Sequence, residues 1–253
     1  MKEMIHDLIV RYVAGYQTEM PIKTKWKQPL TGFADIRHPQ IRTFKELIKS
    51  DHFMPEDIVE NPTVIICYFI PFENEIGNSN IPGRAGEPSD TWARAYKETN
   101  EMMAALNQFL VDEIRSAGFR AAFKPNDQLF SDTNLKSRWS HRHFAYLAGL
   151  GTFGINNMMI TKNGCCGRIN SIVADIPVEP DQPLTQEKCL YKAKGVCQAC
   201  INRCTEQALT LEGFDRQKCS DTCDRTQLFG HGICGKCVVN LPCTYKDPIA
   251  PCI

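Results

Sequence analysis

Ten of the 13 cysteines lie between Cys189 and Cys252, and these thiols are the side chains whose number and spacing best suit chemistry. Thiolates at short spacings are ligands for soft metals and for iron–sulfur clusters. A secreted disulfide scaffold would instead spread an even number of cysteines through a short chain behind a signal peptide. The pattern therefore predicts metal thiolates in a reducing compartment.

The spacing divides these cysteines into two runs. Cys197, Cys200 and Cys204 form CxxCxxxC, the second half of the bacterial ferredoxin run, and Cys189 can supply a fourth ligand. The second run comprises an upstream cysteine and the string CGKCVVNLPC at 234–243. In ferredoxins the last cysteine of each run binds the other run's cluster. We therefore predict two 4Fe-4S clusters, one held by Cys189, Cys197, Cys200 and Cys243 and the other by Cys204, Cys219, Cys234 and Cys237.

Structural zinc is the alternative, because two CxxC pairs are sufficient for one tetrahedral ion. A zinc ribbon does not require Cys189, Cys204 and Cys219 at their observed spacings, so the iron–sulfur interpretation is favoured. Cys223 lies four residues after Cys219 and could replace it as a ligand. Cys252 is expected to be a spare thiol near the end of the chain.

The segments ahead of the cysteines predict a layered domain. Residues 63–69, TVIICYF, form a short apolar run between prolines and predict a buried strand. Apolar residues at helical spacing predict a helix over 91–117, with Gly118 directly after it. Further strands are expected at 120–123 and 168–175, and further helices at 1–16 and 139–148. Interleaved strands and helices favour an α+β fold with a layered α/β domain, a mixed sheet with flanking helices, over residues 1–183. Residues 184–253 would form the ferredoxin-like double-cluster module.

The string GLGTFG at residues 149–154 matches the dinucleotide pattern GxGxxG. A phosphate-binding turn must follow a strand and open a helix, whereas this string follows a predicted helix and precedes a strand-like run. The order argues against a dinucleotide site. Gly149 and Gly151 are instead expected to allow a left-handed helix exit and a close backbone approach.

Overall charge excludes a general attraction to nucleic acid or to an anionic membrane. Lys and Arg together number 29, as do Asp and Glu, so any such partner would have to be recognised locally. No run of about 18 apolar residues suggests a membrane span. The N-terminal residues are too charged for a secretory signal, and the chain is expected to be cytoplasmic.

With these motifs, the chain resembles the epoxyqueuosine reductase family, including the short iron–sulfur members found in anaerobes. This family is related to the reductive dehalogenases. The similarity extends from GFADIRHP at 32–39 to the end of the chain. Its main carriers are WSHRHFAYLAGLGTFGINNMMIT at 139–161, NGCCGRINSIVAD at 163–175, CxxCxxxC followed by TEQAL, and CGKCVVNLPC.

The resemblance implies a reductase in which two 4Fe-4S clusters pass electrons to a corrinoid, a cobalamin-type cofactor, or to a substrate in the N-terminal domain. It also implies an electron donor protein of the ferredoxin or flavodoxin type. Asp132 in FSDTN is the nearest counterpart of the family's proton-donating aspartate. The residues expected at the cofactor pocket are Trp139, His141, Tyr146, Gly149, Gly151 and Arg168. Arg168 could bind an anionic substrate or cofactor group through its planar fork, or equally form an ordinary surface ion pair. Of His141 and His143, one is expected to be packed or hydrogen-bonded and the other exposed.

Two departures from the family pattern bear on the substrate. The full-length reductases carry a helical-repeat domain used for tRNA beyond the ferredoxin module, and this sequence lacks one. Thr205 stands where a proline usually follows the ferredoxin cysteine. A small-molecule or protein substrate is therefore favoured over tRNA. An electron-transfer or reductive-activation partner of another corrinoid enzyme, and a minimal epoxyqueuosine reductase acting on tRNA, are the alternatives.

Overall fold

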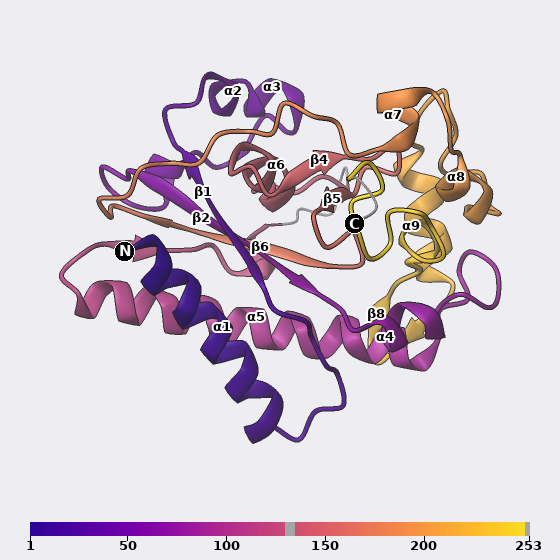
Figure 1. Ribbon diagram of the computed structural model, residues 1–253, viewed down its shortest axis with the longest axis horizontal. Coiled ribbons are helices and arrows are strands. Elements are labelled where there is room, and N and C mark those ends of the chain that lie inside the picture. Colours follow the sequence, from indigo (N-terminus) through magenta and orange to yellow (C-terminus); the bar gives the residue numbers. More distant parts are fainter. Residues whose placement is uncertain (130–134, 251–253) are drawn as a thin grey trace.

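The computed structural model describes residues 1–129 and 135–250, and its centre is a four-stranded sheet covered by helices on both faces (Figure 1). The strand order is β1-β2-β6-β3. The strands span Leu30–Asp35 (β1), Val64–Pro71 (β2), Gly167–Ala174 (β6) and Ala121–Ala122 (β3). All three strand pairs are antiparallel, so the expectation of a mixed sheet was wrong. The β1–β2 and β3–β6 connections join antiparallel neighbours. Strands β2 and β3 both lie antiparallel to β6 and therefore run in the same direction, so the connection between them crosses from one end of the sheet to the other.

Strand β2 shows why the sheet needs helices on both sides. Its side chains alternate between two core clusters, with Ile66 and Tyr68 on one face and Cys67 and Phe69 on the other. Every residue of the strand is buried. Since complete burial of such a side chain contributes about 1.5–3 kcal/mol, this apolar run stabilises both layers at once.

Helices α1 (Lys2–Glu19) and α5 (Asp90–Ser116) cover one face (Figure 1). The predicted long helix is confirmed, and Ser89 caps it by accepting a hydrogen bond from the Trp92 amide at 3.1 Å. Gly118 follows the helix with φ +87°, the left-handed conformation expected there.

The opposite face carries α2 (Pro39–Arg42), α3 (Phe44–Leu47) and α6 (His141–Leu147). Helix α6 begins two residues later than the sequence suggested. The chain leaves it through Gly149 at φ +67° and enters β4 (Gly151–Phe153), which pairs with β5 (Met159–Thr161). The order helix, glycines, strand is confirmed, and a Cβ on Gly151 would lie 2.3 Å from the Ile160 carbonyl oxygen.

The C-terminal segments gather at one end of the sheet (Figure 1). They comprise α7 (Leu190–Lys194), α8 (Ala199–Arg203), α9 (Arg216–Asp224), β7 (Gln227–Leu228), β8 (His231–Gly232) and the 3-10 turn η3 (Lys236–Val238). Ile233, Val238 and Val239 join the main core cluster, so this region packs directly on the larger one. The remaining short elements are α4 (Asn74–Ser79) and the 3-10 turns η1 (Pro55–Asp57) and η2 (Asn126–Gln128).

The segment 177–183, directly ahead of the predicted boundary between residues 183 and 184, lies along β1. The Asp181 amide donates to the Phe33 carbonyl at 2.7 Å, and the Asp181 carboxylate accepts from the Phe33 amide at 2.8 Å. Lys2 pairs with the same carboxylate at 2.6 Å. None of the described helices is both long and apolar enough to cross a bilayer.

Candidate functional site

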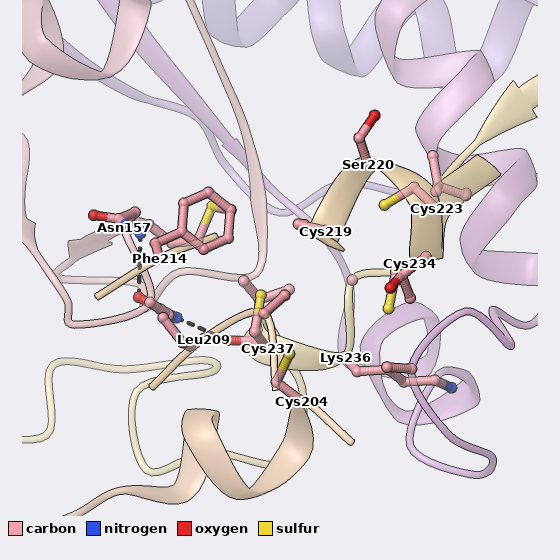
Figure 2. A pocket seen from close by; sticks show the side chains of 18 of the residues that line it. Asn157, Cys204, Leu209, Phe214, Cys219, Ser220, Cys223, Cys234, Lys236 and Cys237 are labelled. Carbon is pink, nitrogen blue, oxygen red and sulfur yellow. Dashed lines mark hydrogen bonds between the residues drawn. The ribbon is translucent and has the colours of Figure 1, made fainter. Parts of the chain in front are cut away.

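Ten of the cysteines line two separate hollows. A small hollow of about 20 Å³ is lined by Cys189, Cys197, Cys200 and Cys243. A larger cavity of about 470 Å³ is lined by Cys165 and by Cys204, Cys219, Cys223, Cys234 and Cys237, the last five labelled in Figure 2. The first hollow is surrounded by one predicted ligand set, and the cavity by the other set plus Cys165 and Cys223.

Short local structures hold these thiols. Gly235, between Cys234 and Cys237, has φ +72°, and the Trp92 ring packs so closely on it that a Cβ would lie 2.3 Å from ring carbon Cε2. The Gly86 amide donates to Cys234 Sγ at 3.3 Å. Asn156 Nδ2 donates to the Cys237 carbonyl oxygen at 2.7 Å. The loop of the CGKC motif is therefore held by the larger region.

The thiols within each set influence one another electrostatically. Burial raises the pKa of Cys200 to about 12, and nearby Cys243, Cys189 and Cys197 contribute. Burial also raises the pKa of Cys237, with added repulsion from Cys234, Cys219, Cys200 and Cys204. Grouped thiolates are therefore costly without a cation, and binding of a metal centre would release their protons.

Cys219 and Cys223 form a hydrogen-bonded pair one turn apart on α9. This bond from Cys223 lowers the pKa of Cys219 to about 7, and Arg216 lowers it further. The same bond raises the pKa of Cys223. Cys219 is therefore the thiol that ionises first, and Cys223 donates to it.

Among the described residues, no three His, Cys, Asp or Glu side chains converge closely enough to hold a single metal ion. A zinc site draws four ligands to within about 2.3 Å of one ion. A four-iron cluster binds one thiolate at each iron and therefore needs its ligands further apart.

The larger cavity extends to the sheet and helices of the N-terminal region. Its wall there includes Tyr96 from α5, Arg142 from α6, Met158 directly before β5, and Arg168 from β6. From the C-terminal region, Arg216 of α9 also lines it. In Figure 2, Asn157 and Phe214 lie across the cavity from the cysteines. Apart from these cations the described lining is mainly apolar. The cavity therefore combines thiols, cations and apolar surface, as in sites that hold small organic ligands.

Behind this wall, His141 belongs to a buried polar network. The Trp139 indole donates to Ser171 Oγ at 3.0 Å, and the same hydroxyl is hydrogen-bonded to His141 Nδ1 at 2.8 Å. Burial, with the nearby Arg168 guanidinium, lowers the pKa of His141 to about 3. The other ring nitrogen, Nε2, is a buried atom without a hydrogen-bond partner in the described structure.

The pocket residues expected from the sequence lie in different places. Arg168 lines the cavity. Trp139 and Tyr146 pack in or against the second core cluster, and Gly149 lies against the Gln182 carbonyl oxygen. Asp132 and Cys252 lie outside the described residues. Neither His141 nor His143 is exposed, so the expectation of one exposed histidine was wrong. Their roles toward a cofactor stay predictions.

The sequence did not point to Arg142, Arg216, Asn80 or Lys236. Lys236 is 1% exposed, and its ammonium points away from the cysteine side chains (Figure 2). A lysine between the cysteines of a CxxC motif was the available signal. Nothing in the spacing of the arginines indicated that they share a cavity.

The sequence comparisons agree with the resemblance. No family model matches the chain. The epoxyqueuosine reductase of Vibrio cholerae is 27% identical over 157 residues, which cover 61% of this chain and 38% of the relative. That of Staphylococcus aureus is 38% identical over 82 residues, or 32% of this chain and 20% of the relative. The chain thus matches well under half the length of these curated relatives.

Solved structures share the fold. The epoxyqueuosine reductase of Bacillus subtilis aligns over 98% of this chain and 68% of its own, with a TM-score of 0.56 and 15% identity. A catabolic reductive dehalogenase aligns over 87% of this chain and 30% of its own, with a TM-score of 0.58 and 16% identity. The chain therefore resembles epoxyqueuosine reductases in sequence and shares a fold with them and with reductive dehalogenases.

Proposed function

We propose that this chain is an iron–sulfur reductase in which electrons pass through two 4Fe-4S clusters to a cofactor or substrate in the larger cavity. One observation carries the proposal: two sets of thiols line two separate hollows, and one of these is a cavity shared with the N-terminal region. Single electrons could then travel from the cluster at the small hollow, which we call the outer set of thiols, to the reacting group in the cavity without leaving the protein.

The thiols fit this assignment by number and by neighbourhood. Cys189, Cys197, Cys200 and Cys243 would hold the outer cluster, and Cys204, Cys219, Cys234 and Cys237 the inner one. The clusters, when bound, relay one electron at a time, and their potentials depend on hydrogen bonds to sulfur and on burial. The Gly86 amide supplies one such bond to Cys234.

A corrinoid is the cofactor that the relatives suggest. One neighbouring structure is described as a reductive dehalogenase that suggests a mechanism for B12-dependent dehalogenation. A corrinoid, when bound, would supply cobalt-centred reductive chemistry. His141 Nε2, a buried atom near the cavity without a partner among the described residues, is a group of this chain that could hold and orient it.

The proton for the reduction has a candidate source outside the described residues. The Bacillus subtilis structure is described as having an aspartate catalytic loop swung out of its active site. Asp132 is our candidate for the corresponding group here. Leu135, three residues later, lines the cavity.

Electrons would come from a ferredoxin-type or flavodoxin-type protein docking near the outer set. Val196, next to Cys197, is 54% exposed and offers an apolar contact there. The same feature supports a second candidate function, an electron-transfer or activation partner of another corrinoid enzyme. The cavity favours the reductase, because a carrier needs no internal space for a ligand.

Anaerobic purification with metal analysis tests the proposal. We expect about eight iron atoms per chain, visible absorption and no stoichiometric zinc, as two four-iron clusters require. Cys200→Ala should retain about half of the iron, whereas Cys67→Ala, a control in the core, should retain all of it. Colourless protein with one or two zinc ions would refute the proposal. Titration of the loaded protein with cobalamin then tests the cofactor, and absence of binding under reducing conditions would remove it.

A further inference from the structure

Three arginines face the larger cavity without an acidic partner. Arg142, Arg168 and Arg216 line it, and none of them takes part in an ion pair within the part of the chain that the structure describes. The one carboxylate in the described lining, Asp224, is hydrogen-bonded on its own helix by Ser220 at 3.4 Å. A chain of zero net charge has thus concentrated uncompensated positive charge at this cavity.

Two of these arginines, Arg142 and Arg168, are partly enclosed and keep N–H donors that are free to bind a ligand. Arg142 donates from one terminal nitrogen to the Asn157 carbonyl oxygen, while burial and then the charges of Arg216 and Arg168 lower its pKa. The Arg168 guanidinium lies 4.3 Å from the centre of the Tyr96 ring and donates to Asn100 Oδ1 at 3.0 Å. Its Nε is buried without a partner. Since a guanidinium has five N–H donors, both retain capacity for a ligand.

The thiol set accounts for only some of this charge. Arg216 lies near Cys219 and Arg142 near Cys237, so their charges would also offset thiolates bound to iron. Arg168 comes from β6, in the N-terminal region, and its contacts are Tyr96, Asn100 and the neighbouring cations. An anion that enters the cavity would therefore find Arg168 available and Arg142 beside it.

The rest of the cavity lining indicates what the uncharged part of a ligand would be. Trp92, Tyr96, Met158 and Phe214 present aromatic and thioether surface. The inner cluster would take up part of the volume of about 470 Å³, so the space that remains suits a compact organic molecule. A guanidinium binds carboxylate or phosphate oxygens through parallel N–H donors. An apolar body with one oxyanion group satisfies both parts of the cavity.

We infer that the cavity binds a small organic anion, whose carboxylate or phosphate is held by Arg168 and Arg142 and whose body packs on the aromatic wall. The inference rests on the proposed function, because it names the substrate class for the same site. It differs from recognition of an RNA backbone, which would spread phosphate contacts over an exposed surface.

Matched probes test this with the full, cluster-loaded chain. Calorimetric titration under anaerobic conditions would compare benzoate with benzamide, which has nearly the same shape and no charge, and phenyl phosphate would separate phosphate from carboxylate. We expect the better anion to bind at least tenfold more tightly than benzamide. Arg168→Met should abolish that preference and leave benzamide binding unchanged. Arg11→Met, an exposed site on α1, is the control.

Each outcome decides between the claims. Equal affinity for charged and neutral probes in the wild-type protein would overturn the inference, and this comparison needs no variant to fold. An RNA stem-loop that binds in an Arg168-dependent manner while benzoate and phenyl phosphate do not would also overturn it. If iron and visible absorption are intact in either case, the proposed function stands. A chain that never acquires iron refutes the proposed function itself.

Discussion

The ammonium of Lys236 lies 2.9 Å from the backbone oxygen of Asn80, which precedes it by 156 residues. The same ammonium reaches Asn80 Oδ1 at 3.3 Å and the Pro82 carbonyl oxygen at 2.5 Å. Asn80 Nδ2 in turn donates to the Cys234 carbonyl oxygen at 2.9 Å. A lysine inside the CGKC motif thus ties the cysteine loop to the segment that follows α4.

Replacing Lys236 should loosen this connection. Lys236→Met removes the donor to the backbone carbonyl oxygens of Asn80 and Pro82, whereas Asn80 Oδ1 keeps the Ser89 amide as a donor. The expected cost is about 1–3 kcal/mol in the free energy of unfolding, since unsatisfied buried acceptors lose their solvation. Urea unfolding followed by circular dichroism measures the cost, with exposed Lys218→Met as the control. Equal midpoints for the two variants would contradict the structural role of Lys236.

The close contact of Gly235 with Trp92 predicts unequal effects of two glycine substitutions. Gly195 has φ +69° and open space around it, so Gly195→Ala should lower the free energy of unfolding only by the cost of a left-handed alanine, about 1–2 kcal/mol. Gly235→Ala has the same backbone strain and also collides with the Trp92 ring, which should add about 1–3 kcal/mol. Thermal unfolding of both variants measures the difference, and a smaller loss at Gly235 would show that the contact is unimportant.

The pair Cys219 and Cys223 allows the cluster ligand to be identified. We expect Cys219→Ala to retain about half of about eight irons, because it removes the thiol that ionises first. Cys223→Ala should retain all the iron but lower the potential of that cluster, because a hydrogen bond to the ligand sulfur is lost. Cys223→Ser, which can still donate, is the matched control. Loss of half the iron in Cys223→Ala would instead make Cys223 the cluster ligand and Cys219 its hydrogen-bond donor.

Acid should destabilise the fold through His52. This imidazole is 1% exposed, its Nε2 accepts from the Ser140 amide at 3.0 Å, and its Nδ1 donates to the Phe53 carbonyl oxygen at 2.6 Å. Burial lowers the pKa of His52 to about 4, below its ordinary value of 6.5. The unfolded state therefore binds more protons between pH 6.5 and 4, and the free energy of unfolding should fall as the pH falls through this window.

For one such histidine, the free energy of unfolding should change by no more than about 1.4 kcal/mol per pH unit. Urea unfolding at several pH values measures it in the wild type and in His52→Gln, where the slope should decrease. An identical slope in His52→Gln would mean that other groups cause the acid sensitivity.

Local patterns of the sequence determined the main elements and the cysteine groups. The apolar run at 63–69, the helical spacing of 91–117 with Gly118, and the order of elements around Gly149 depend on neighbouring residues alone, and the structure bears them out. The two ligand sets came from the spacing of the cysteines together with the crossing of ligands between ferredoxin runs.

Tertiary structure alone decided the direction of the strands and the composition of the cavity. Arg142, Arg168 and Arg216 come from three separate elements, and Lys236 meets Asn80 across 156 residues. Such distant pairs carry no periodic signal, because their meeting depends on how the helices and the antiparallel sheet pack. The thiols could be recognised from the chain itself, whereas the cations and the aromatic wall that face them became visible only in the folded protein.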